Sequence, residues 1–282
     1  MPTFFKCGRF DFNLEPGSRP LIMGVLNVTP DSFSDGGKFI HLEAAISHAE
    51  QMIASGVDII DIGGESSRPS ATPLSIQEEL DRVMPVIFAL RDCGKPLSID
   101  TYKAVVMREA LAAGADMIND IRAFQEPDAV KVIAESDCGL CMMHMQNLPQ
   151  TMQAAPHYED PVLEVTAFLH QRLLTLADAG VDKNRLCIDP GFGFGKTLVH
   201  NLMLWQNLER IRETINLPVL VGVSRKAMIG TITGRASSDR LAGSVTAALA
   251  AAEQGAQLVR VHDVAETIDA FAVWQALRPP CF

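Results

Sequence analysis

The sequence predicts a single-domain (β/α)8 TIM barrel over residues 1–282, preceded by a short N-terminal β-hairpin. Eight short apolar runs recur along the chain, and each ends at or beside a polar or ionisable residue. Helix-patterned stretches lie between these runs, and the length is near the ~250 residues typical of such barrels. An open, doubly wound α/β sheet has the same alternation of elements and is the alternative fold.

The N-terminal segment alternates apolar and polar residues over Thr3–Phe12, on both sides of a Cys7-Gly8-Arg9 turn. This alternation predicts a small β-hairpin. Because the hairpin precedes the repeating pattern, we expect it to close the bottom of the barrel.

The eight predicted strands are near-continuous apolar runs rather than alternating ones. Such runs are typical of parallel strands that are covered by helices on one face and by barrel packing on the other. The carboxyl ends of all eight should meet at one rim, where barrel enzymes carry their chemistry. The predicted strands are Leu21–Leu26, Asp58–Ile62, Pro96–Ile99, Asp116–Ile118, Gly139–Met143, Leu186–Ile188, Pro218–Val223 and Leu258–Val261.

The stretches between the strands have the apolar spacing of amphipathic helices. Ser75 with Glu78 three residues later forms a capping-box pattern at one helix start. Gly56, Gly114 and Gly180 each follow a helix pattern and precede an apolar strand, as in the short connections of parallel α/β folds. The predicted helices are Leu42–Ala54, Ser75–Leu90, Lys103–Ala113, Asp128–Glu135, Pro161–Ala179, His200–Thr214, Asp239–Gln254 and Val264–Leu277.

Composition and charge exclude several classes of function. The formal net charge of -10 argues against a nucleic-acid partner, which needs a basic surface. No apolar run approaches the ~20 residues of a membrane helix, and the N-terminus lacks a signal-peptide pattern, so we expect a soluble cytoplasmic protein. The six cysteines lack zinc-ligand spacing. Cys138 and Cys141 have redox-motif spacing, but Cys141 falls in a predicted buried strand, which favours a core thiol.

Three polar side chains converge on the expected rim. Asp100, Asn119 and Asp189 each follow directly on a predicted strand. One such aspartate is equally well explained as a helix N-cap, but buried carboxylates need partners. Two carboxylates and an amide at one rim suit a flat heterocycle that presents adjacent N–H groups.

Cationic side chains gather after the last two strands. Ser224, Arg225 and Lys226 follow strand seven, and Arg260 and His262 end strand eight. Barrels often bind a phosphate at these two loops. An ion pair inside the barrel is the alternative for Arg260, and a Schiff-base amine is the alternative for Lys226. Because Arg225 is adjacent, a charged Lys226 that donates hydrogen bonds is favoured.

Two further loops follow predicted strands at this rim, one after Asp189 and one after Asn27. The segment 190–197 nearly matches a phosphate-binding P-loop, but Pro190 stands at the first glycine position and has no N–H. We therefore predict a flexible rim loop, in which Phe192 and Phe194 face a ligand. The polar loop that follows Asn27 and ends at Gly37 predicts a mobile lid over the same rim.

Five motifs in this order and spacing resemble the bacterial dihydropteroate synthases over nearly the whole chain. The motifs are Asn27–Gly37, Gly63–Pro69, Asp189–Lys196, Ser224–Lys226 and Arg260–Asp263. The resemblance implies a cytoplasmic, homodimeric transferase of folate biosynthesis on a (β/α)8 barrel. Such an enzyme joins 6-hydroxymethyl-7,8-dihydropterin diphosphate to 4-aminobenzoate and releases diphosphate.

The resemblance also implies roles for individual residues. The pterin would contact Asp100, Asn119, Asp189, Lys226 and Arg260. The cofactor Mg2+ would bind to Asn27. The diphosphate would lie among Asn27, Ser67, Arg68, Arg260 and His262. The 4-aminobenzoate, with which sulfonamides compete, would contact Phe33, Pro69, Phe192, Ser224 and Arg225. The catalytic residues would be Lys226, Arg260, His262 and Asp100.

Two other functions use a similar pterin pocket. A pterin-dependent methyltransferase needs neither diphosphate-binding cations nor the lid after Asn27, so these features argue against it. A pterin-binding module without catalysis is the second alternative. Release of diphosphate that depends on 4-aminobenzoate would distinguish the synthase from both.

Overall fold

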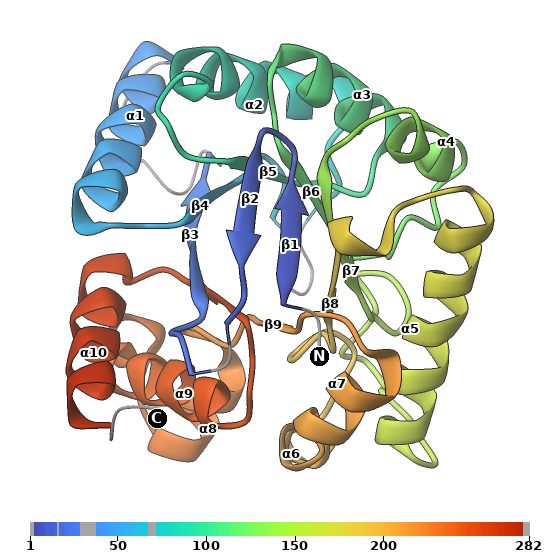
Figure 1. Cartoon of the computed structure of the whole chain (residues 1–282), viewed down its shortest axis with the longest axis vertical. Coiled ribbons are helices and arrows are strands. Elements are labelled where there is room, and N and C mark those ends of the chain that lie inside the picture. The colour runs from blue at the N-terminus through green and yellow to red at the C-terminus, as the bar shows by residue number, and fades with distance from the viewer. Residues whose placement is uncertain (1–2, 16, 29–37, 67–71, 279–282) are drawn as a thin grey trace.

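Eight parallel strands form the centre of the molecule, and helices surround them (Figure 1). This computed structural model describes residues 3–15, 17–28, 38–66 and 72–278. Parallel neighbours are joined by crossovers on the outside of the sheet, so consecutive strands lie side by side. The fold is the predicted (β/α)8 barrel with its N-terminal hairpin.

A single parallel bridge closes the sheet. The strands are β3 (Leu21–Asn27), β4 (Ile59–Gly63), β5 (Leu97–Asp100), β6 (Met117–Asp120), β7 (Gly139–Met143), β8 (Leu186–Asp189), β9 (Leu220–Val221) and β10 (Leu258–Val261). Their order in the sheet is β8-β7-β6-β5-β4-β3-β10-β9. Ile188 of β8 bridges to Val219 beside β9, and the Ile188 N–H donates to the Pro218 carbonyl at 2.9 Å. The alternative of an open, doubly wound sheet is therefore wrong.

The helices occupy the predicted stretches with two differences. They are α1 (Lys38–Ser55), α2 (Ile76–Leu90), α3 (Ala104–Ala113), α4 (Ala129–Ala134), α5 (Pro161–Asp178), α6 (Leu198–Gln206), α7 (Leu208–Ile215), α8 (Ala227–Thr233), α9 (Leu241–Glu253) and α10 (Val264–Leu277). The predicted helix 200–214 is divided at Asn207, whose φ of -115° leaves the helical range. Helix α8 was not predicted, because its seven residues are too few to establish a helical period. In the described ranges, no helix has the length and apolar character needed to span a bilayer.

The capping box predicted at the start of α2 is present. The Glu78 N–H donates to Ser75 Oγ at 3.2 Å, and the Ser75 N–H donates to Glu78 Oε2 at 2.9 Å. These two bonds satisfy donors that the first helical turn leaves unpaired. The helix therefore begins where the sequence places it.

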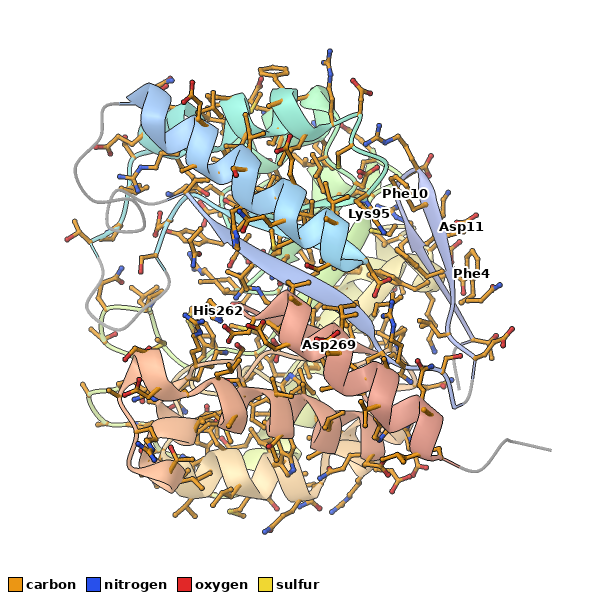
Figure 2. All side chains as sticks on the ribbon, turned by 90° about the vertical axis from the view of Figure 1, so that its left-hand side faces the viewer. Phe4, Phe10, Asp11, Lys95, His262 and Asp269 are labelled. Carbon is orange, nitrogen blue, oxygen red and sulfur yellow. The ribbon has the colours of Figure 1, made fainter. Side chains whose placement is uncertain are left out.

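The hairpin fills the bottom of the barrel, as predicted. Strands β1 (Phe4–Cys7) and β2 (Phe10–Asn13) pair antiparallel. Phe5 and Cys7 are fully buried against side chains from the first halves of the barrel strands. Figure 2 places the hairpin residues Phe4, Phe10 and Asp11 on the opposite side of the strands from His262.

Four buried cysteines are free thiols. Cys7, Cys138, Cys141 and Cys187 are buried and form no disulfide. Burial raises the pKa of Cys138, which disfavours the reactive thiolate. The core-thiol interpretation of the Cys138–Cys141 spacing is therefore the one that the structure supports.

An ion pair attaches the hairpin to the barrel. Asp116, which precedes β6 and is almost fully buried, accepts hydrogen bonds from Arg9 Nε at 2.8 Å and Arg9 Nη2 at 2.9 Å. The same carboxylate accepts from the Leu97 N–H at 3.1 Å. A surface pair between Lys6 and Asp137, at 3.5 Å, links the same hairpin but is exposed.

We expect Asp116→Ala to lower the free energy of unfolding by about 1–3 kcal/mol, because it leaves the buried Leu97 N–H without an acceptor. Urea unfolding followed by circular dichroism measures this change. The matched control Lys6→Ala removes only the exposed pair and should cost less than about 1 kcal/mol. Equal losses in the two variants would contradict the assignment.

Candidate active site

The carboxyl ends of the strands open into a cavity of about 670 Å³, a volume suited to a small-molecule ligand. It lies on the side of the strands where Figure 2 labels His262, away from the hairpin. Predicted site residues that line it are Asn27, Asp100, Ser224, Arg225, Lys226, Arg260 and His262. The structure thus brings residues from β3, β5, β10 and the loop after β9 to one rim.

A half-buried guanidinium joins two carboxylates at the floor of this cavity. Arg260 Nε donates to Asp61 Oδ2 at 2.6 Å, and Arg260 Nη2 donates to Asp100 Oδ2 at 2.8 Å. Although burial alone would lower it, the pKa of Arg260 is raised by these two carboxylates. Burial raises the pKa of Asp100 to about 7, against the opposing effect of Arg260. The ion pair considered for Arg260 is therefore present, and it forms part of the cavity wall.

Asp61 is the site residue that the sequence interpretation missed. It lies in the middle of β4, is 0% exposed, and also accepts from Ser98 Oγ at 2.6 Å and Asn119 Nδ2 at 3.2 Å. Apart from Arg260, the prediction considered residues at or beyond the ends of the apolar runs. A usable signal was present, because Asp61 and Arg260 are the charged residues that interrupt the interiors of predicted strands. Each needs a buried partner, and together they form one.

Asp189 lies close to Arg260, as the proposed pocket requires. A Cβ placed on Gly222 would lie 3.7 Å from Asp189 Oδ2 and 3.6 Å from Arg260 Cβ. Asp189 Oδ1 accepts from the Gly191 N–H at 2.7 Å, and burial raises the pKa of this carboxyl. Because Gly222 has no side chain, the space between Asp189 and Arg260 stays open for a ligand.

The Lys226 ammonium is held at the cavity wall by a carbonyl and an aromatic face. Lys226 Nζ donates to the Phe192 carbonyl at 2.8 Å and lies 4.5 Å from the centroid of the Phe194 ring. Burial lowers the pKa of Lys226 to about 8. Both contacts stabilise the charged form, which is the form favoured from the sequence.

The residues expected around the anion form a second polar group. Ser224 Oγ lies 3.1 Å from the ring nitrogen His262 Nδ1, and it accepts from the backbone N–H of His262 at 3.2 Å. Burial, followed by the charge of Arg260, lowers the pKa of His262 to about 4, so this imidazole is neutral near pH 7. Arg225 forms an ion pair with Asp263 through Nε at 3.0 Å, which holds its guanidinium at the rim.

One aromatic residue does not lie where it was expected. Phe192 is fully buried, and its ring packs against Trp205 with the centroids 5.6 Å apart. The ring that lines the cavity from this loop is that of Phe194. The two residues are separated by Gly193, and the positive φ of 81° at that glycine turns them to different sides. The sequence alone did not indicate which ring faces inward.

A second ionic cluster borders the cavity beside Asp100. Lys103 donates to the carboxylates of Glu65 and Glu79, the latter at 2.6 Å. Tyr102 Oη donates to Glu65 Oε1 at 3.2 Å. Glu65 also lines the main cavity and accepts from the Leu74 N–H at 3.2 Å. The Glu65 carboxylate therefore links Glu65, which precedes the segment 67–71, to Leu74, which follows it.

Four expected site residues lie outside the described part of the chain: Phe33, Ser67, Arg68 and Pro69. The lid expected over 28–37 likewise falls there, apart from its first residue, Val28.

Asn27 suits the predicted role at a Mg2+ ion. A Cβ on Gly63 would lie 3.5 Å from Asn27 Oδ1 and 3.9 Å from Asp100 Oδ2, so both oxygens face one region of the cavity. Among the described residues, no group of three or more His, Cys, Asp or Glu side chains could hold a metal. Mg2+ commonly takes only one or two protein oxygens and completes its shell with water and substrate phosphates. A single amide oxygen therefore fits this ion when a diphosphate is also present.

The fold and site define an enzyme-like barrel whose pocket suits a flat, N–H-bearing heterocycle and an anion. A family model described as pterin binding enzyme matches residues 23–262, and the chain belongs to this family. It is 51% identical over 262 residues to a dihydropteroate synthase of Haemophilus influenzae, with 92% of this chain and 94% of the relative covered.

Solved structures give the same result. The Xanthomonas albilineans dihydropteroate synthase with 4-aminobenzoic acid has a TM-score of 0.91 and 48% identity, with 99% of this chain and 100% of the other covered. The Burkholderia cenocepacia enzyme with 7,8-dihydropteroate has a TM-score of 0.88 and 48% identity, with 98% and 97% covered. The resemblance seen in the sequence is confirmed.

We expect Asp61→Asn to weaken pterin binding by about tenfold or more, because the neutral amide removes the negative charge that holds the Arg260 guanidinium, and hydrogen bonds to charged groups contribute roughly 1.5–3 kcal/mol. Titration with a dihydropterin measures the affinity. The control Asp58→Asn changes a carboxylate at the other end of the same strand, where it pairs with Arg19, and should leave the affinity unchanged. Unaltered binding in Asp61→Asn would exclude a role of Asp61 in pterin binding.

Proposed function

We infer that this chain catalyses the dihydropteroate synthase reaction. It transfers the 7,8-dihydropterin-6-ylmethyl group of 6-hydroxymethyl-7,8-dihydropterin diphosphate to 4-aminobenzoate, with release of diphosphate. The observation that carries this inference is the Asp61–Arg260–Asp100 network, in which the fully buried Asp61 holds Arg260 so that this cation and the Asp100 carboxylate both line one cavity. The names and bound ligands of the relatives support it.

The floor of the cavity has the hydrogen-bonding groups that a pterin needs. The amino group and adjacent ring N–H of a pterin are donors, and the carboxylate of Asp189 is an acceptor-only group. The ring carbonyl and ring nitrogens need donors, which Lys226 and the Asn119 amide supply. We therefore place the pterin between Asp189 and Asp100, with its methylene directed toward Arg260.

The cationic side of the cavity suits the leaving group. When the methylene C–O bond breaks, its electron pair remains on diphosphate, and negative charge grows on oxygen. Arg260 and an N–H of neutral His262 offset this charge without reorganisation. When bound, Mg2+ supplies further positive charge to the diphosphate, and Asn27 is the described residue that we propose holds it.

The arylamine completes the reaction on the outer side. Its nitrogen lone pair forms the new C–N bond with the electron-poor methylene, after which the nitrogen loses its proton. We propose that Phe194, Ser224 and Arg225 border the 4-aminobenzoate, together with Phe33 and Pro69. Phe194 takes the place proposed for Phe192, because its ring lines the cavity.

We further propose that the protein acts as a homodimer in the cytoplasm. This proposal is supported by the resemblance to the bacterial synthases. Light scattering coupled to size-exclusion chromatography tests the proposed homodimer. A mass equal to one chain at micromolar concentration would overturn it.

A coupled diphosphate assay tests the proposed function. The chain, the pterin diphosphate, 4-aminobenzoate and Mg2+ should together release diphosphate and form 7,8-dihydropteroate. Omission of 4-aminobenzoate should abolish release, omission of Mg2+ should reduce it strongly, and a sulfonamide should compete with 4-aminobenzoate. Pterin binding without any diphosphate release would instead favour the non-catalytic module.

We expect kcat/KM for the pterin substrate to decrease above about pH 8. The pKa of Lys226 is lowered to about 8, so the ammonium loses its proton, and one hydrogen-bond donor, as the pH rises through that value. Initial rates from pH 6 to pH 10 measure the profile. Lys226→Arg remains charged across this range, so its kcat/KM should be lower but should not decrease with the same midpoint. A wild-type profile that is flat to pH 10 would contradict this role of Lys226.

A further inference from the structure

Lys196 lies at the end of the glycine-rich loop after β8, with its ammonium directed back into that loop. Lys196 is only 3% exposed. Lys196 Nζ lies 2.9 Å from His144 Nδ1, and it donates to the Gly191 and Phe194 carbonyls at 3.0 Å each. The His144 carbonyl lies a further 3.4 Å from Nζ, so even the ammonium form, with its three N–H donors, faces more acceptors than it has donors. Lys196 therefore has no donor left for a phosphate, in contrast to the lysine of a P-loop.

The loop that surrounds Lys196 has no regular secondary structure to hold it in place. Gly191, Gly193 and Gly195 all have positive φ values, between 63° and 81°. A Cβ on Gly195 would lie 2.6 Å from the Gln146 carbonyl oxygen, so the loop packs tightly against the segment after β7. Its buried carbonyls need donors from elsewhere, and Lys196 supplies two of them.

The same loop holds two of the pterin-pocket side chains. The Gly191 N–H donates to Asp189 Oδ1 at 2.7 Å. The Phe192 carbonyl accepts from Lys226 Nζ at 2.8 Å. The backbone groups in these two bonds belong to Gly191 and Phe192. Both residues lie in the stretch 191–194, whose first and last carbonyls accept from Lys196. The orientation of Asp189 and Lys226 is thus linked to the position of the Lys196 ammonium.

His144 connects this arrangement to the neighbouring strand. It follows β7, its N–H donates to the Asp189 carbonyl at 3.1 Å, and its ring packs edge-on against Phe168 at 4.9 Å. Burial, and then the charge of Lys196, lowers the pKa of His144 to about 3, so the imidazole is neutral and can accept through Nδ1. His144 Nδ1 thus acts as the third acceptor for Lys196 Nζ, beside the carbonyls of Gly191 and Phe194.

We propose that Lys196, anchored by His144, is a positioning residue that holds the loop 190–195 so that Asp189 and Lys226 face the pterin. Lys196 lines the cavity, but its N–H donors are taken up by the loop and by His144, so we assign it no direct bond to the substrate. The proposal rests on the proposed function for its kinetic test, but a binding measurement tests it independently. Its effect should be greater on the pterin half of the site, because Ser224 and Arg225, which we assign to 4-aminobenzoate, lie on another loop and only Phe194 of that group lies on this one.

The test compares Lys196→Met with the wild type. Methionine keeps an apolar stem of similar shape but donates no hydrogen bonds. We expect KM for the pterin diphosphate and the Kd of a dihydropterin to rise at least tenfold, while KM for 4-aminobenzoate changes less than threefold. Equal changes in the two KM values, or an unchanged pterin KM and Kd, would overturn the proposal.

Arg185→Met is the matched control for loss of a buried cation. Arg185 precedes β8 at the opposite end of the strand and donates to the Cys138 and Ile133 carbonyls at 2.8 and 2.9 Å. This variant should lose stability, but its KM and Kd values should stay within twofold of the wild type. A pterin-specific loss in Arg185→Met as large as that in Lys196→Met would show a merely structural effect and overturn the proposal.

Two substitutions of His144 decide the question if Lys196→Met does not fold. Asparagine can present an acceptor near the position of Nδ1, whereas leucine cannot. His144→Leu should raise the pterin Kd about tenfold, and His144→Asn should restore it to within threefold of the wild type. Equal Kd values in these two variants would overturn the proposal. If the wild type binds dihydropterin but shows no turnover, the proposed function fails while the Kd comparison still tests the positioning role.

Discussion

The site depends on one half-buried charge that is satisfied from two sides. The Arg260 guanidinium is bound by Asp61, which is fully buried, and by Asp100, from two different strands. Removing a charged partner from such a network leaves the others uncompensated in a medium of low dielectric, which costs several kcal/mol. The network therefore fixes the relative positions of β4, β5 and β10 at their carboxyl ends. It also provides a polar floor inside an otherwise apolar barrel.

The parts of the fold that the sequence predicts are those set by local patterns. The strands were recognisable because each is a continuous apolar run, and the start of α2 was marked by Ser75 and Glu78. Helix α8 is too short for a period to be established, and the break at Asn207 depends on packing. For these two features the tertiary structure, rather than the local pattern, decides the outcome.

The site was predicted to the extent that its residues end strands. Asp100, Asn119, Asp189 and Arg260 are brought together because parallel strands share a direction. Asp61 was not singled out, although a charged residue inside an apolar strand needs a buried partner. The choice between Phe192 and Phe194 depends on the φ value of Gly193, and no local pattern specifies which ring turns inward. The contact of Lys196 with His144 joins residues 52 positions apart, and it could not be predicted from the loop sequence itself.

The apolar seal formed by Phe5 and Cys7 has a consequence for the order of molecular events. Because this end of the barrel is filled, substrates and products pass through the opposite opening. In the arrangement that we propose, the heterocycle takes the innermost position, so an arylamine that arrived first would obstruct its path. This arrangement predicts that the bicyclic partner loads before the aromatic acid, and that the joined product leaves with its benzoate end leading.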